Sequence, residues 1–257
     1  MLPNSIARLP EGWRAASDAL SERVILVTGA TGGLGRAGAV AAARAGASVV
    51  LLGRNVRRLE KVYDEVAELG RAQPAIYPLD LAGANPKDYA ELAARIDAEF
   101  GRLDGVVHAA AFFSALQPIS DIAAEEWLQL LHVNLSAPFL LTQACAPLLQ
   151  RAADSSVVFV LDDPQRTRRA YWGGYGAAKQ GLAGFASILH DEWENSAARV
   201  HMLLPPPMRT TLRRAAYYGE NTLDLPLPDD AATALVYLLA PAGAAARGLV
   251  LDLRDPT

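Results

Sequence analysis

The sequence predicts a doubly wound α/β fold, in which one parallel sheet carries helices on both faces. Short β-branched runs alternate with longer amphipathic segments, and a glycine-rich turn joins the first run to the first amphipathic segment. The runs are almost wholly apolar, as expected of strands buried on both faces. A β-α-β-α rhythm of this kind implies parallel strands joined by helical crossovers. The 257 residues, 51% of them hydrophobic, are enough for one large domain over 1–257, with 1–21 as an N-terminal extension.

About seven strands and at least five helices are expected. The apolar runs predict strands over 24–28, 48–52, 75–79, 105–109, 156–161, 199–204 and 249–253. The amphipathic segments predict helices over 34–45, 55–69, 86–100, 120–150 and 172–195. The irregular stretch 205–228 begins with three prolines and follows a strand, where ligands bind in such sheets, so it is the expected substrate-side loop.

Composition narrows the classes of partner. A net charge of -4 argues against nucleic acid or an anionic membrane as the main partner. Cys145 is the only cysteine, which excludes an intrachain disulfide and suits a reducing compartment. No apolar run resembles a signal peptide or reaches the roughly 20 residues of a membrane span. The four histidines lack metal-ligand spacing. We therefore expect a soluble cytoplasmic protein that binds no nucleic acid, membrane or metal.

The first predicted strand runs directly into the sequence TGATGGLG, residues 28–35. Its glycines allow a tight turn and a close approach of the backbone to a pyrophosphate, and the helix that follows adds free N–H groups. This strand–turn–helix setting is typical of a Rossmann-type dinucleotide site. The loop residues expected to bind the cofactor are Gly29, Thr31, Gly33, Leu34 and Gly35.

Arg54 follows the second predicted strand, near the expected position of the adenosine ribose. An acidic residue there would accept a hydrogen bond from the ribose 2′-hydroxyl, whereas arginine suits a 2′-phosphate. NADP(H) is therefore the preferred cofactor and NAD(H) the possible one. A solvated surface arginine is the alternative interpretation.

Tyr175 and Lys179, in YGAAK, lie one turn apart on the same face of a predicted helix. A phenol titrates near pH 10, so it shuttles protons poorly at neutral pH unless a cation favours the phenolate. Lys179 could supply that cation. The same spacing also occurs on ordinary helix surfaces, so the interpretation depends on the surrounding motifs.

Together these motifs resemble the short-chain dehydrogenase/reductase family, from about residue 22 to 253. TGATGGLG is similar to the TGxxxGxG cofactor motif of that family, and YGAAK to its YxxxK motif. Further positions that correspond to the family pattern are the adenine-contact position, the strand-four NAG position, the helix asparagine of a water-mediated proton relay, and the nicotinamide-side PGxxxT motif. They fall on Asp80 with Leu81, on Ala109 and Ala110, on Asn134, and on Pro205 with Thr210.

The resemblance implies roles for these residues. Tyr175 would be the general acid/base toward a carbonyl or carbinol, and Asn134 would support the proton relay. Lys179 would lower the pKa of Tyr175 and hold the nicotinamide ribose. The resemblance also implies a dimer or tetramer paired through two helices. The apolar residues spread around 135–150 and 172–193 favour the same self-association, although a monomer with some exposed apolar surface is the alternative.

Asp162 departs from the family pattern, because it lies thirteen positions before Tyr175, where the family has a substrate-orienting serine. A carboxylate about 4 Å from the phenol would oppose its ionisation by roughly 4 kcal/mol at an effective dielectric of about 20. It would also repel a developing alkoxide. A protonated Asp162 could instead donate a hydrogen bond as serine does, or one of three nearby arginines could neutralise it. These are Arg166, Arg168 and Arg169, and the segment could also be a solvated loop without a role.

Two more departures affect the same half of the site. The strand-four motif has alanine at 109, 110 and 111, so its asparagine and glycine are missing. Pro206 and Pro207 follow Pro205, so a backbone donor expected at either position is absent. Arg209, Arg213 and Arg214 with Tyr217 and Tyr218 form either a lid for an anionic substrate or a solvated helix.

Three functions are compatible with these features. The leading hypothesis is an NADP(H)-dependent oxidoreductase acting on a small carbonyl/alcohol pair. The second is a catalytically impaired cofactor-binding homologue, a sensor or scaffold, because Asp162 replaces the serine. The third is an enzyme of altered chemistry, in which Asp162 pairs with a cationic amine or imine substrate.

Overall fold

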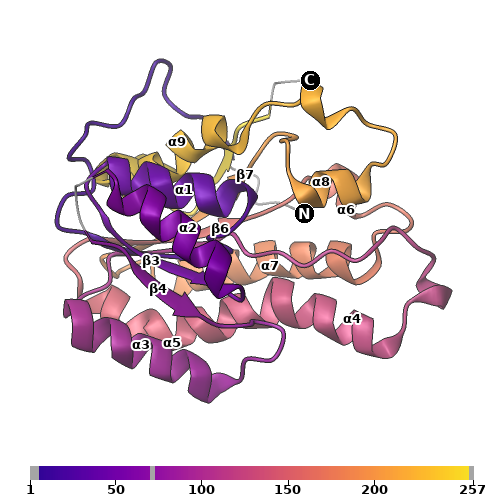
Figure 1. The fold of residues 1–257 in the computed structure, drawn as a ribbon, viewed down its shortest axis with the longest axis horizontal. Helices are drawn as coiled ribbons and strands as arrows, with labels where there is room; N and C mark the ends of the chain where they lie inside the picture. Colours follow the sequence, from indigo (N-terminus) through magenta and orange to yellow (C-terminus); the bar gives the residue numbers. More distant parts are fainter. Residues whose placement is uncertain (1–5, 70–72, 255–257) are drawn as a thin grey trace.

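The computed structural model describes residues 6–69 and 73–254, which form one sheet covered by helices (Figure 1). Over these ranges there are eight strands in the order β1-β8-β7-β6-β5-β2-β3-β4, and every neighbouring pair is parallel. The strands are β1 Ile6–Ala7, β2 Val24–Thr28, β3 Ser48–Gly53, β4 Ala75–Pro78, β5 Gly105–His108, β6 Ser155–Val160, β7 Ala198–Leu204 and β8 Val250–Asp252. The predicted α/β fold is confirmed.

Two layers of helices cover the sheet (Figure 1). One face carries α1 Gly33–Arg44, α2 Val56–Ala67 and α9 Pro228–Leu239, whose apolar side chains form one buried cluster with the strands. The other face carries α3 Pro86–Phe100, α5 Ala137–Arg151 and α7 Gly173–Glu192, which form a second cluster. Because both faces are covered, the strands are apolar throughout rather than alternating.

The strands β2 to β8 are the seven predicted ones, and each of their ends lies within one residue of the prediction. The additional strand, β1, comes from the N-terminal extension, of which residues 1–5 lie outside the described ranges. It pairs with β8, and Arg8 fixes it by donating to the carbonyl oxygens of Asp252 at 2.9 Å and Arg254 at 2.8 Å.

Four helical regions differ from the prediction. The helix predicted over 120–150 consists of α4 Ala124–Leu131, a π-helical turn His132–Ser136, and α5. The stretch 205–228, predicted to be irregular, contains α8 Thr211–Ala216, and a short helix, α6 Pro164–Thr167, precedes α7. Thr210 caps α8, because its hydroxyl oxygen accepts from the Arg213 N–H at 3.1 Å. The helix α9 was not predicted. None of the helices in the described ranges is long and apolar enough to cross a membrane.

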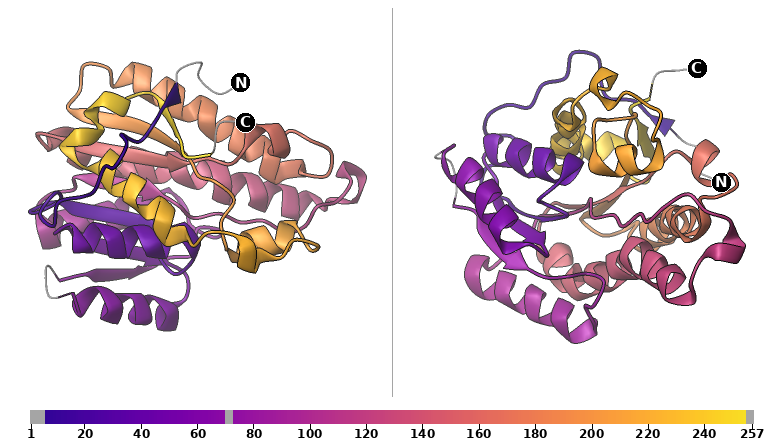
Figure 2. Two further views of the ribbon diagram at one scale, coloured as in Figure 1. Left: turned by 90° about the horizontal axis from the view of Figure 1, so that it is seen from above. Right: turned by 45° about the vertical axis from the view of Figure 1, so that its right-hand side comes forward.

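The direction of winding changes between β2 and β5. The strand β2 pairs with β3 on one side and with β5 on the other, so the loops after β2 and β5 diverge at the carboxyl edge of the sheet. Ligands of doubly wound folds bind at this switch point. The segment before α4 and the segment containing α8 both project at the same end of the molecule (Figures 1 and 2).

Candidate active site

A cavity of about 380 Å³ opens at the carboxyl edge of the sheet. It joins the glycine loop after β2 to the Tyr175–Lys179 pair on α7. The predicted site residues that line it are Gly29, Thr31, Gly33, Leu34, Arg54, Asp80, Leu81, Ala109, Ala110, Asp162, Tyr175, Lys179, Pro205 and Thr210. Gly35 and Asn134 are not among its lining residues.

The glycine loop is packed so tightly that side chains are excluded from two of its positions. Gly29 has a φ of 66°, and a Cβ there would lie 2.8 Å from the Ala110 Cα. A Cβ on Gly35 would overlap the Gly29 carbonyl oxygen. In the described chain, no side chain caps the N-terminus of α1, and its first turn holds no acidic residue. The loop and the free N–H groups of this 12-residue helix fit an anionic pyrophosphate.

The adenosine side of the cavity is more open. Arg54 and Asp80 are both exposed and line the cavity, and the Asp80 carboxylate accepts from the Ala82 N–H at 3.1 Å. Leu81 beside them is buried. This arrangement leaves the Arg54 guanidinium accessible to an anionic group.

Asn134 lies in the π-helical turn and is buried. Its amide nitrogen donates to the carbonyl oxygens of Phe112 at 2.8 Å and Leu130 at 2.9 Å, and its amide oxygen accepts from the Phe112 N–H at 3.1 Å. Both amide protons are therefore engaged by the backbone. The Asn134 side chain thus fixes the segment that carries Phe112, a residue that lines the cavity. A role of Asn134 in a proton relay stays a prediction.

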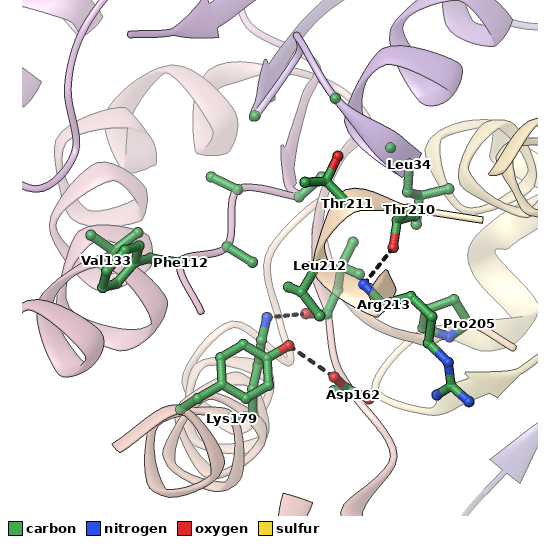
Figure 3. A pocket seen from close by; sticks show the side chains of 18 of the residues that line it. Leu34, Phe112, Val133, Asp162, Lys179, Pro205, Thr210, Thr211, Leu212 and Arg213 are labelled. Carbon is green, nitrogen blue, oxygen red and sulfur yellow. Dashed lines mark hydrogen bonds between the residues drawn. The ribbon is translucent and has the colours of Figure 1, made fainter. Parts of the chain in front are cut away.

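Tyr175 and Asp162 both line the end of the cavity away from the glycine loop, which we call its inner end. Asp162 and Lys179 are labelled there in Figure 3. The phenol hydroxyl donates to Asp162 Oδ2 at 2.8 Å, so the carboxylate lies against the hydroxyl, the arrangement that the family resemblance implies for position 162. The other carboxylate oxygen, Oδ1, accepts from the Asp163 N–H at 2.6 Å and from Arg166 at 3.3 Å. Of the three arginines that could neutralise Asp162, Arg166 is the one that contacts it.

The surroundings of Tyr175 hold its phenol in the protonated form. Burial raises its pKa well above 10.0, and the charge of Asp162 and the hydrogen bond to it raise the pKa further. The Arg166 guanidinium lowers it by a smaller amount. A general base needs a pKa near the working pH, so this phenol is a poor base in the structure described.

Lys179 does not contact the phenol oxygen. Its ammonium donates to the Val160 carbonyl oxygen at 3.0 Å and lies 5.8 Å from the centroid of the Tyr175 ring. Burial lowers the pKa of Lys179 to about 8, although the charge of Asp162 raises it. The cation expected beside the phenol is thus supplied by Arg166, which also approaches the Asp163 carboxylate at 3.4 Å.

Aromatic residues complete the inner end of the cavity. Phe112, Trp172 and Tyr217 line it, and the Trp172 ring lies 5.8 Å from Tyr175 and 6.1 Å from Tyr217. Sequence reasoning did not single out Phe112 or Trp172. The spacing could have identified Trp172, because it precedes Tyr175 by three residues and residues three apart lie on the same face of a helix.

The arginines and tyrosines of 209–218, for which a lid and a solvated helix were the alternatives, lie in different surroundings. Arg213 and Tyr217 line the cavity, and the guanidinium carbon lies 3.7 Å from the centre of the tyrosine ring. Arg209 instead donates to backbone oxygens, among them Thr222 at 3.2 Å, and Tyr218 is 83% exposed.

The buried ammonium of Lys179 predicts a pH-dependent stability. The fall of its pKa from 10.5 to about 8 corresponds to about 3 kcal/mol. Between pH 8 and 10.5 the unfolded chain binds more protons than the folded one, so the cost of burying the cation is complete below pH 8 and disappears as the pH rises through about 10.5. The unfolding free energy of the unmodified protein should therefore rise by about 3 kcal/mol over this range because of Lys179. Lys179→Met lacks this rise, so its unfolding free energy should fall behind that of the unmodified protein by the same amount. Urea unfolding at several pH values measures this, and Lys87→Met, at an exposed position, should show no such trend.

Comparisons with known proteins identify relatives of this chain. The sequence pattern of the family described as short chain dehydrogenase matches residues 23–221. The Escherichia coli (strain K12) protein named Uncharacterized oxidoreductase YciK is 35% identical over 240 residues, which are 93% of this chain and 95% of that protein.

Solved structures agree as well. A short chain dehydrogenase from Salmonella enterica serovar Typhi is 35% identical, with a TM-score of 0.91 over 95% of this chain and 100% of that one. A protein of Escherichia coli CFT073, solved in complex with NADPH, is 37% identical, with a TM-score of 0.89 over 94% of this chain and 100% of that one. With the glycine loop and the Tyr175–Lys179 pair lining one cavity, these matches identify the chain as a member of the short-chain dehydrogenase/reductase family of oxidoreductases.

Proposed function

We propose that the protein is an NADP(H)-dependent oxidoreductase that binds its cofactor and a small-molecule substrate together in this cavity. The observation that carries the proposal is that this cavity is continuous from the glycine loop to Tyr175. When bound, the nicotinamide cofactor supplies or accepts the hydride. The NADPH complex of the Escherichia coli CFT073 relative supports the choice of cofactor.

The cavity residues divide between the two ends of the cofactor. The glycine loop and the N-terminus of α1 would hold the pyrophosphate, and Arg54 would hold the 2′-phosphate of the adenosine ribose. Asp80 and Leu81 would lie beside the adenine. Lys179 would hold the nicotinamide ribose, and Pro205 with Thr210 would border the nicotinamide.

NADPH is expected to bind about ten- to a hundredfold more tightly than NADH, because a charge-assisted contact to phosphate contributes roughly 1.5–3 kcal/mol. Arg54→Ala should remove most of this difference by weakening NADPH and leaving NADH nearly unchanged. Titration calorimetry with both cofactors measures it. Arg57→Ala, three residues further on at an exposed position, is the matched control and should keep the preference. Equal affinities in the unmodified protein would contradict the role of Arg54.

The chemistry at the substrate end has two candidates. A carbonyl/alcohol pair is the first, with Tyr175 as proton donor or acceptor. The hydrogen bond from Tyr175 to Asp162 favours the second, a protein that binds the cofactor but reduces neutral carbonyls poorly. Oxidation of NADPH across a panel of aldehydes and ketones, run beside direct measurement of NADPH binding, separates the two.

We also propose that the protein self-associates through α5 and α7. Phe139 on α5 and Ile188 on α7 are 42% and 60% exposed, so each helix presents a large apolar side chain to solvent. Light scattering at micromolar concentration should give the mass of a dimer or tetramer. The double variant Phe139→Asp, Ile188→Asp should shift it toward the monomer, and Leu223→Asp, at an exposed leucine outside these helices, should not. A monomer mass for the unmodified protein would reject the proposal.

A further inference from the structure

Cationic side chains outnumber carboxylates on the walls at the inner end of the cavity. The cations are Lys179, Arg166 and Arg213, and the carboxylate is Asp162. This carboxylate already has partners, because it accepts from the Tyr175 hydroxyl at 2.8 Å and from Arg166 at 3.3 Å. The charges that face the cavity therefore disfavour a cationic substrate.

The ion-pair network that includes Asp162 is balanced. Its carboxylates belong to Asp162, Asp163 and Asp252, and its guanidinium groups to Arg166, Arg254 and Arg8. Arg254 joins Asp163 to Asp252, with contacts at 2.8 Å and 2.9 Å. Arg8 donates to the backbone carbonyl oxygen of Asp252 at 2.9 Å. With three charges of each sign, this network gives the cavity no excess charge.

The positive excess comes from Lys179. Within the described chain its ammonium forms no ion pair, and it donates to the Val160 carbonyl oxygen at 3.0 Å. Burial lowers its pKa only to about 8, so most of the ammonium is protonated at neutral pH. The inner end thus carries about one net positive charge.

Arg213 offers an anion the N–H groups that its ion pair leaves unused. Its Nε and Nη2 both donate to the Glu220 carboxylate at 2.6 Å, and Glu220 does not line the cavity. The third nitrogen, Nη1, donates to no acceptor of the described chain. Glu220 therefore fixes the orientation of a guanidinium group that still has two N–H donors for a planar anion.

A row of aromatic rings separates Arg213 from Tyr175. The Trp172 ring lies 5.8 Å from the Tyr175 ring and 6.1 Å from the Tyr217 ring, and the Arg213 guanidinium carbon lies 3.7 Å from the centre of the Tyr217 ring. A molecule that reaches from the phenol to the guanidinium group passes along these aromatic walls. They favour a flat apolar segment between its two polar ends.

On this basis, and resting on the proposed NADP(H)-dependent hydride transfer, we propose that the substrate is a carbonyl compound that carries a carboxylate, and that Arg213 binds this carboxylate through Nη1. A flat apolar segment, such as an aromatic ring, separates the carboxylate from the carbonyl group, which lies at Tyr175. The carboxylate takes no part in the bonds that form and break. It determines which carbonyl compounds bind.

Two matched substrates and two matched variants test the proposal. The compounds 4-formylbenzoate and 4-formylbenzamide differ in charge and hardly in shape. With NADPH, the unmodified protein should show a kcat/KM for the benzoate at least about tenfold above that for the benzamide, mainly through KM. Arg213→Gln should lower this ratio by about tenfold or more. Arg214→Gln, at an exposed position of the same helix that does not line the cavity, should leave it within about twofold.

Glu220→Gln distinguishes anion binding from a purely structural role of Arg213. It removes the ion pair with Glu220 but keeps the guanidinium group, so the preference for the benzoate should persist or increase. If Arg213 only fastens α8 through Glu220, Arg213→Gln and Glu220→Gln should change the rates with both substrates alike and leave the ratio unchanged. That result would overturn the proposal.

A binding measurement complements the kinetics. The alcohol 4-(hydroxymethyl)benzoate, titrated into the NADP⁺-loaded protein, should bind about ten times more weakly to Arg213→Gln than to the unmodified protein or to Arg214→Gln. If no turnover occurs, this difference alone supports the anion site, and equal binding to all three proteins overturns it. Equal kcat/KM values for the benzoate and the benzamide also overturn it. Failure of NADPH to bind removes the proposed function as well, whereas NADPH binding without any preference for the anion removes this inference alone.

Discussion

Asp162→Ser is expected to raise NADPH-dependent reduction of neutral aldehydes and ketones by about tenfold to a thousandfold, since each 1.36 kcal/mol recovered at the transition state gives a factor of about ten. The carboxylate accepts from the Tyr175 hydroxyl at 2.8 Å and raises the pKa of the phenol. Serine removes the charge and restores a neutral hydroxyl donor toward the substrate oxygen. Steady-state oxidation of NADPH with one aldehyde and one ketone measures the gain.

The proline-rich loop limits the size of the activity gain, and a Tyr175→Phe variant controls for its origin. Pro206 and Pro207 line the cavity without offering an N–H group, so the gain can be smaller than the electrostatic argument allows. Tyr175→Phe in the Asp162→Ser background should abolish the activity gained. Brisk carbonyl reduction by the unmodified protein that falls in Asp162→Ser would show that the carboxylate itself serves carbonyl reduction.

Gly35→Ala is expected to weaken NADPH binding by more than about tenfold and to lower the melting temperature. The added Cβ overlaps the Gly29 carbonyl oxygen, and because this contact is with backbone, the whole loop after β2 must shift. A shifted loop misplaces the N–H groups at the start of α1, which fit the pyrophosphate. Titration calorimetry and thermal unfolding together report both effects.

Gly32→Ala is the matched control for stability. A Cβ at this position, three residues earlier in the same loop, meets no protein atom within 4 Å. Its melting temperature should stay within about 2 °C of the unmodified protein, because surface substitutions usually cost less than about 0.5 kcal/mol. A Gly35→Ala protein that melts and binds NADPH as the unmodified protein does would show that the loop is not closely packed.

The fold was largely predictable because buried parallel strands leave a strong pattern. The runs at 24–28 and 105–109 are apolar on both faces, and the structure places them side by side as β2 and β5. The strand β1 escaped prediction because only Ile6 and Ala7 form it and a tertiary contact, pairing with β8, creates it. The helix α9 escaped because it is apolar almost all round, so it lacks the amphipathic period that marked the other helices.

The site was predictable where the family resemblance assigned positions. It placed Asp162 at the position of a residue that faces Tyr175, and the structure has the carboxylate accepting from the phenol. Arg166, one of the three arginines considered as a partner of the carboxylate, contacts it. The direction of the Lys179 side chain could not be read from spacing, because it depends on the Val160 carbonyl oxygen at the end of β6. The hydrogen bonds between the Asn134 amide and the Phe112 backbone could not be predicted either, because they depend on the path of the chain after β5.

The most direct test of the central claim, that burial and the Asp162 carboxylate together hold the Tyr175 phenol protonated, is a pH titration of that phenol. Tyrosine labelled with ¹³C at Cζ reports ionisation by NMR, and the Tyr175→Phe spectrum identifies the resonance. In the unmodified protein the Tyr175 signal should remain that of the protonated phenol at pH 10.0, the ordinary pKa of tyrosine. In Asp162→Ser the transition should move to lower pH by at least about one unit, because both the adjacent charge and its hydrogen bond are removed. A transition below pH 10.0 in the unmodified protein, or one that Asp162→Ser leaves in place, would contradict the account.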